Sequence, residues 1–117
     1  MELCKMYGKN GPSDKKLRIV QGLKSGKNFK DLAEELQIAK PTAEVYGIDC
    51  LAAGQDVDFQ EIAAYMDINR ESFAIIQGEI MKVHDKKLRT VRDNLREAFS
   101  YNQIRFVLAC LIRDLHL

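Results

Sequence analysis

Apolar residues recur three and four positions apart along most of the chain, in short runs that each begin just after a residue that favours the helix N-cap. The residues in this capping position are Ser13, Asn28, Asp58, Asn69 and Ser100. Runs of this kind are typical of short amphipathic helices, and no stretch shows the alternation expected of a half-buried strand. The sequence therefore predicts an all-α fold, a compact bundle of about seven short helices.

The predicted helices, with their caps, follow from where each run begins and ends. We expect them at residues 13–24, 28–36, 41–54, 58–66, 69–82, 86–98 and 100–115. The last run carries a wide apolar stripe, formed by Ile104, Val107, Leu108, Leu111, Ile112 and Leu115. A stripe this wide predicts that the final helix lies centrally in the core or packs on a partner.

The chain of 117 residues is the size of one domain. Residues 1–12 contain two glycines and a proline without an apolar period, which predicts a flexible lead followed by one domain over residues 13–117. No run of about 18 apolar residues and no signal-peptide pattern occurs. We therefore expect an intracellular protein, nuclear in a eukaryote and cytoplasmic or nucleoid-associated in a bacterium.

The residues that usually carry chemistry are sparse. Three cysteines, Cys4, Cys50 and Cys110, are widely spaced without a CxxC pair, and only two histidines are present. This spacing favours reduced thiols over disulfides or a metal site, and Cys50 and Cys110 are expected to fill the core. No GxxxxGK[ST] phosphate-binding loop occurs. We expect a chain that is not an enzyme and that takes no cofactor and no metal.

Charge is unevenly distributed behind a net charge of +1. Residues 1–40 have a net charge of +4, residues 41–80 of −7 and residues 81–117 of +4. This pattern excludes a uniformly basic nucleic-acid binder, but it leaves basic patches at both ends of the chain.

Residues 26–42 have the layout of a DNA-binding helix-turn-helix. Phe29 and Leu32 anchor the first helix, Ala33 allows the two helices to approach closely, and Leu36 and Ile38 close the turn. Any compact pair of helices needs similar anchors, so this pattern alone is only moderately specific.

The segment FKDLAEELQIAKPTAEVYGIDCLAAGQDVDF resembles the C-terminal helix-turn-helix accessory domain of RecQ-type DNA helicases, the family of the Werner syndrome helicase. The family positions are filled here by Phe29, Leu32, Ala33, Thr42, Tyr46, Gly54, Val57 and Asp58. Farther on, SYNQIRFVLA resembles the family's closing helix, so the similarity covers residues 26–59 and 88–112. The resemblance implies a non-catalytic module appended to a helicase that acts in DNA unwinding, repair or recombination.

The second helix of the motif is poorly suited to reading bases. Residues 42–53 contain no Arg, Lys, Asn or Gln, the side chains that usually contact base edges. In one rotation of this helix Ala43, Tyr46, Cys50 and Leu51 face inward, and in the other Val45, Ile48 and Ala52 do. Gly47 stands where the family usually has leucine, at a cost of roughly 1 kcal/mol relative to alanine, and we expect a large side chain from elsewhere to fill the gap.

Two interaction surfaces follow as alternatives. The first is weak, salt-dependent binding of the DNA backbone, for which the candidates are Lys27, Lys30, Lys40, Thr42, Lys86, Lys87, Arg89, Arg92 and Arg96. Arg89, Arg92 and Arg96 are expected to share one helix face, and Tyr101 with Arg105 is a candidate pair for stacking on a base. The second is a face for a protein of the repair or replication machinery, formed by Glu44, Val45, Ile48 and Asp49.

Overall fold

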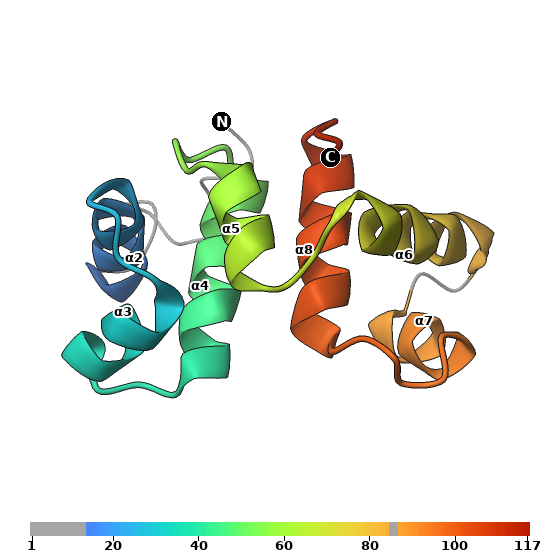
Figure 1. Ribbon diagram of the computed structural model, residues 1–117, viewed down its shortest axis with the longest axis horizontal. Helices are drawn as coiled ribbons and strands as arrows, with labels where there is room; N and C mark the ends of the chain where they lie inside the picture. The colour runs from blue at the N-terminus through green and yellow to red at the C-terminus, as the bar shows by residue number, and fades with distance from the viewer. Residues whose placement is uncertain (1–13, 85–86) are drawn as a thin grey trace.

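The computed structural model describes residues 14–84 and 87–117, which form seven α-helices and no strand (Figure 1). The helices are α2 (Asp14–Lys24), α3 (Phe29–Leu36), α4 (Lys40–Ala52), α5 (Phe59–Tyr65), α6 (Arg70–Lys82), α7 (Leu88–Asn94) and α8 (Tyr101–Ile112). The all-α prediction is therefore confirmed. The predicted lead at 1–12 and the predicted cap Ser13 lie outside the described residues.

Four of the predicted N-caps make the hydrogen bonds expected of them. The side-chain oxygen of Asn28 accepts from the backbone N–H of Asp31 at 2.9 Å, and that of Asn69 accepts from Ser72 at 2.8 Å. Asp58 caps α5 in the same way, by accepting from the N–H of Gln60. Ser100 and Gln103 form a reciprocal capping box at the start of α8. Local side-chain chemistry thus fixes where α3, α5, α6 and α8 begin.

The helices after α2 form three consecutive helix-turn-helix pairs, α3–α4, α5–α6 and α7–α8. Residues 28–50 align without a gap on residues 58–80, so that Phe29 corresponds to Phe59 and Ala33 to Ala63. The turns match as well, since Gln37 and Asp67 both have a left-handed backbone, with φ of 56° and 57°. In each turn the following isoleucine donates its N–H to the carbonyl of the corresponding alanine, at 3.0 and 2.9 Å. The first two pairs are therefore repeats in sequence and in turn geometry, although α5 and α6 do not pack on one another as α3 and α4 do.

The third pair differs, and the predicted helix at 86–98 is too long. Helix α7 ends at Asn94, because Arg96 and Glu97 both adopt left-handed φ, 56° and 59°. The chain reverses there through hydrogen bonds from Arg96 N to Asp93 O and from Glu97 N to Arg92 O. Neither residue is a glycine, so the sequence gives no sign of this turn. The final helix likewise ends at Ile112, before the predicted limit at 115.

Helix α8 lies at the centre of the fold, as its wide apolar stripe predicted. It packs against α4, α6 and α7, while α4 also packs against α2 and α3. Helices α4 and α8 run side by side in the same direction (Figure 1). The fully buried side chains of α8 are Ile104, Phe106, Val107 and Cys110. Within the described residues, no helix combines the length and the apolar character needed to cross a bilayer.

Gly47 is explained by the aromatic ring of Phe29, which confirms the prediction that a large side chain fills the gap. A Cβ at residue 47 would lie 2.8 Å from Cε1 and 2.9 Å from Cζ of that ring. Phe29 is 1% exposed and also meets the ring of Tyr65 edge-on, with centroids 5.9 Å apart. The ring has no room to withdraw, so α4 and α3 reach their separation only with glycine at this position.

Two glycine substitutions should therefore change stability in opposite directions. Gly47→Ala should lower the free energy of unfolding by about 1–3 kcal/mol, because overpacking against Phe29 outweighs the gain in helix propensity. Gly78→Ala, also in the middle of a helix, should raise it by about 1 kcal/mol, since a Cβ there meets no atom within 4 Å. Urea unfolding in dilute solution measures both. Stabilisation by Gly47→Ala would contradict the packing described.

Candidate nucleic-acid interface

The helix-turn-helix at α3–α4 has the expected internal packing. Helix α3 buries Phe29, Leu32 and Ala33 against α4, and the turn closes through Gln37. The backbone N–H of Gln37 and that of Ile38 bond back to carbonyls of the last turn of α3. This arrangement satisfies the end of α3 and sets the position of α4.

Helix α4 is enclosed along most of its length, which is the decisive feature of this site. No residue from 42 to 53 is exposed, although several are only half-buried. Ala43, Cys50 and Leu51 are buried, as one predicted rotation requires, but Ile48 is buried too, at 3% exposure. The reason is that α8 covers the side of α4 that a free helix-turn-helix would offer to a DNA groove. Neither rotation alone was right, because both faces are packed.

The predicted protein-binding face is only partly accessible. Ile48 lies in the core, and Glu44, whose side chain is 15% exposed, accepts a hydrogen bond from Asn102 at 2.8 Å. Asp49 forms an ion pair with Lys16, with Nζ and Oδ2 3.1 Å apart, which ties α2 to α4. Val45 is half-buried. Glu44, Ile48 and Asp49 thus contribute to the packing of α4 against its neighbours, while Asp49 keeps a 39% exposed side chain.

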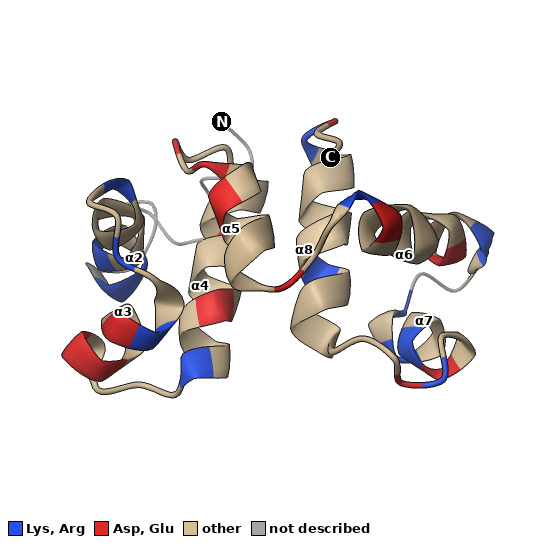
Figure 2. Cartoon of the chain, viewed as in Figure 1, with Lys and Arg blue, Asp and Glu red and all other residues tan. Residues whose placement is uncertain are grey.

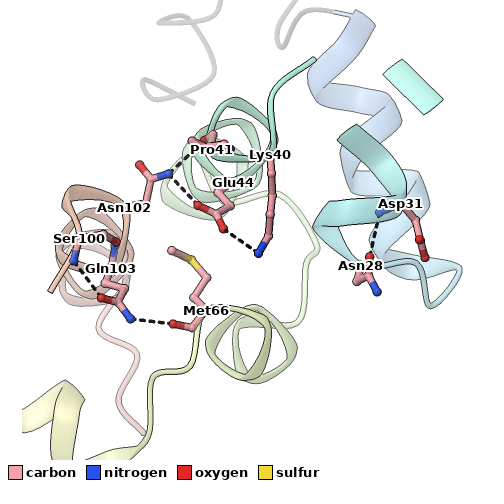
Figure 3. A network of polar contacts seen from close by, with 9 residues as sticks. All are labelled: Asn28, Asp31, Lys40, Pro41, Glu44, Met66, Ser100, Asn102 and Gln103. Carbon is pink, nitrogen blue, oxygen red and sulfur yellow. Dashed lines mark hydrogen bonds and ion pairs between the residues drawn. The ribbon is translucent and has the colours of Figure 1, made fainter. Parts of the chain in front are cut away.

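Asn102 is the polar centre of the α4–α8 contact (Figure 3). Its Nδ2 donates to the carbonyl of Pro41 at 3.0 Å as well as to Glu44, and its Oδ1 accepts from Nη1 of Arg105 at 2.9 Å. Sequence reasoning missed this residue. The available signal was its spacing, since Asn102 stands four residues before buried Phe106 and so lies on the buried face of α8.

The backbone-binding candidates near α3 and α4 lie among carboxylates. Lys27 is paired with Glu35 at 2.5 Å, and Lys40 lies 3.9 Å from Glu44. Lys30 is exposed, but it is the single basic residue of α3, which also carries three carboxylates. Thr42 is half-buried. This end of the motif therefore offers an anionic backbone little net positive charge.

The α7 end is more accessible to an anion. Figure 2 shows basic residues on α2 at one end of the long axis and on α7 at the other. The Arg89 side chain is 83% exposed and loosely paired with Asp93 at 3.9 Å, and Lys87 and Arg96 are exposed. Lys86 lies outside the described residues. We call Lys87, Arg89 and Arg96 the α7 basic cluster.

Two predictions for this region need correction. Arg89, Arg92 and Arg96 do not share one helix face, because α7 ends before Arg96. Arg92 instead lies over the ring of Tyr101, 4.6 Å from its centroid, and 3.6 Å from a carboxylate oxygen of Glu97. Tyr101 therefore stacks with Arg92, and Arg105 is engaged by Asn102. The predicted Tyr101–Arg105 pair does not form.

The cysteines within the described residues are packed in the core. Cys50 and Cys110 are both 0% exposed, as predicted. Burial raises the pKa of Cys50 to about 11 and that of Cys110 to about 12. Thiols with such pKa values are protonated at neutral pH and are poor nucleophiles. Over residues 14–84 and 87–117, no group of three His, Cys, Asp or Glu side chains is placed to hold a metal ion.

Comparison with known proteins agrees with this architecture. The family described as a helix-turn-helix domain matches residues 17–108, from α2 into α8. The chain belongs to this helix-turn-helix domain family. No curated protein and no solved structure gives a significant match. The match extends well beyond α3–α4, so the helix-turn-helix domain comprises the additional helices that enclose α4.

The geometry limits what this helix-turn-helix domain can do with a nucleic acid. Base reading requires a helix that enters the major groove with hydrogen-bonding side chains on its outer face. Helix α4 has neither property, since it is covered and its residues 42–53 lack Arg, Lys, Asn and Gln. The exposed basic residues of α2 and of the α7 basic cluster lie at opposite ends of the fold (Figure 2).

The Asn102 network should contribute measurably to stability. Asn102→Ala removes the donor to Pro41 and Glu44 and leaves their oxygens poorly satisfied, so the free energy of unfolding should fall by about 1–3 kcal/mol. Asn94→Ala, at an exposed position, is the matched control and should change it by less than about 0.5 kcal/mol. Chemical denaturation compares the two. Equal effects would show that the network does not hold α4 against α8.

Proposed function

We propose that this chain is a non-catalytic accessory module of a RecQ-type DNA helicase, which associates weakly with the DNA backbone and does not read base sequence. The observation that carries the proposal is the enclosure of α4, from which no residue between 42 and 53 is exposed. A domain of the helix-turn-helix family with its reading helix covered has only peripheral contacts left for DNA. Backbone contacts position a protein on DNA without specifying sequence.

The helicase part of the proposal rests on resemblance. The motif residues of 26–59 and 88–112 resemble the RecQ accessory domain, and the family match over 17–108 includes nearly all of both segments. The sequence has no phosphate-binding loop, so in this proposal ATP hydrolysis belongs to another part of the parent protein. The role of the module is to position that enzyme on its substrate.

The α7 basic cluster is the favoured contact site. Within the described residues, Arg96 forms no ion pair and Arg89 forms only a loose one, at 3.9 Å, whereas Lys27 at the other candidate site is closely paired with Glu35 and only Lys40 has a similarly loose partner. An incoming phosphate need not displace a packed ion pair at Arg89. Three or so phosphate contacts give weak binding with a salt slope of roughly 0.9 per phosphate neutralised.

The α7 basic cluster should control the salt dependence of DNA binding. Replacing Lys87, Arg89 and Arg96 by Gln should weaken binding to labelled duplex, forked and single-stranded DNA and lower the salt slope by roughly 2–3. Arg92 is left unchanged because it packs on Tyr101. Fluorescence anisotropy titrations at several ionic strengths measure affinity and slope together.

The matched control removes the same charge from the opposite end of the fold, through Lys15→Gln, Arg18→Gln and Lys24→Gln. If the control weakens binding as much as the α7 variant, net charge alone explains the affinity and the α7 assignment is wrong. If the unmodified chain does not bind any of the three DNA forms at low salt, the backbone-binding function is wrong.

The helicase assignment has a separate test. The complete reading frame that contains these 117 residues should encode a GxxxxGK[ST] phosphate-binding loop, and the purified product should hydrolyse ATP when DNA is added. Deleting the module should then reduce unwinding of forked DNA while leaving DNA-stimulated ATP hydrolysis within about twofold. A reading frame without a nucleotide-binding loop would rule out a helicase parent and leave the DNA-binding result unaffected.

A further inference from the structure

Helix α6 carries an apolar outer face that nothing within the described residues covers. Its inner face buries Phe73, Ile76 and Ile80. On the other side Ala74, Ile75, Gly78 and Met81 are all exposed, Ile75 at 47% and Met81 at 71%. We call these four residues the α6 outer face. Isolated exposed apolar residues are ordinary, but a continuous stripe of them along one helix marks an interaction site.

Gly78, in the middle of this face, has no role in the packing of the chain itself. A Cβ at residue 78 would meet no atom within 4 Å, and its φ is not in the left-handed region. Glycine here costs roughly 1 kcal/mol of helix stability relative to alanine, and no contact among the described residues requires it. Gly22 and Gly47, by contrast, are required by side chains that a Cβ would strike. A helix that packs closely on this face would require glycine at residue 78, just as the ring of Phe29 requires glycine at residue 47.

The internal repeat shows what kind of element fits this face. Residues 44, 45 and 48 of α4 correspond to residues 74, 75 and 78 of α6. In the first repeat, that face is covered by a helix, since α8 packs on α4 and Asn102 bonds to Glu44. In the second repeat the corresponding face is open. The surface on α6 is therefore one that this fold elsewhere closes with a helix.

We propose that the α6 outer face binds the α6 outer face of a second copy of this chain, with the two helices antiparallel. Glu71 and Lys82 stand at opposite ends of the face, both exposed, and neither forms an ion pair with the described residues. An antiparallel pair sets each Glu71 level with Lys82 of the second copy. A parallel pair would instead place like charges together. This charge complementarity selects the second copy as partner and fixes its direction.

The same alignment accounts for the glycine. When Glu71 is level with Lys82 of the second copy, Ile75 is level with Gly78 of that copy, so the isoleucine side chain enters the space that the missing Cβ leaves. The two-fold symmetry makes this contact occur twice, once in each direction, as an isologous interface requires. Helix α6 has 13 residues and is therefore about 20 Å long, which limits the interface to the small, transient class.

Sedimentation equilibrium of the 117-residue chain over a wide concentration range tests the proposal. We expect a reversible monomer–dimer equilibrium. Gly78→Leu should raise the dimer Kd roughly 100-fold, because the side chain blocks close approach while the monomer has open space for it. Ala64→Leu, at an exposed small residue of α5, is the matched control and should leave the Kd unchanged. Circular dichroism checks that both variants fold.

Charge exchange distinguishes the antiparallel pair from every other arrangement. Glu71→Lys and Lys82→Glu, each alone, should raise the Kd about 10-fold, because each places like charges together at both ends. The double variant E71K/K82E should return the Kd to within about threefold of the unmodified value. A chain that stays monomeric up to about 1 mM, a dimer insensitive to Gly78→Leu, or a double variant that fails to recover would overturn the proposal.

Discussion

The parallel packing of α8 on α4 is the contact on which the rest of the structure depends. It joins segments about 60 residues apart and is fixed at both ends, by Asn102 donating to Pro41 and by Arg113 donating to the carbonyl of Leu51 at 2.8 Å. The cation of Arg113 at the C-terminus of α4 also interacts favourably with the helix dipole. Because α6 and α7 pack on α8 while α2 and α3 pack on α4, this contact unites the two halves of the molecule.

The same contact separates the fold from the activity usually associated with it. A helix-turn-helix can read DNA only while its second helix is free to enter a groove, and here that helix is the most enclosed element of the first pair. The helix-turn-helix fold is present, but the surface of α4 that would contact DNA bases is packed against α8. Any interaction must therefore use the remaining outer surface of the molecule. What remains is charge at the two ends and an apolar stripe on α6, and the two are independent in chemistry and in place.

Sequence reasoning succeeded where the determinants are local and failed where they are distant. The caps at Asn28, Asp58, Asn69 and Ser100 act within three residues, so the starts of four helices were predictable. The burial of Ile48 was not, because it depends on α8, which lies more than 50 residues farther along the chain. The early end of α7 was missed because Arg96 and Glu97 adopt left-handed φ without glycine. The repeat is present in the sequence as Phe29 and Phe59 with matching neighbours, although only the first of the two pairs carries a known motif.

The order of the repeats in space explains why their second helices have different surroundings. Helix α8, from the third pair, lies between α4 and α6, so α6 is at the edge of the array, while α5 is drawn on the α4 side of α8 (Figure 1). Arrays of stacked repeats normally end in a unit with a polar outer face, which keeps the edge soluble. The α6 outer face is apolar over Ala74, Ile75, Gly78 and Met81 and is charged only at its ends. An edge of that composition resembles the surfaces that neighbouring repeats bury against one another. A further helix can therefore pack on it.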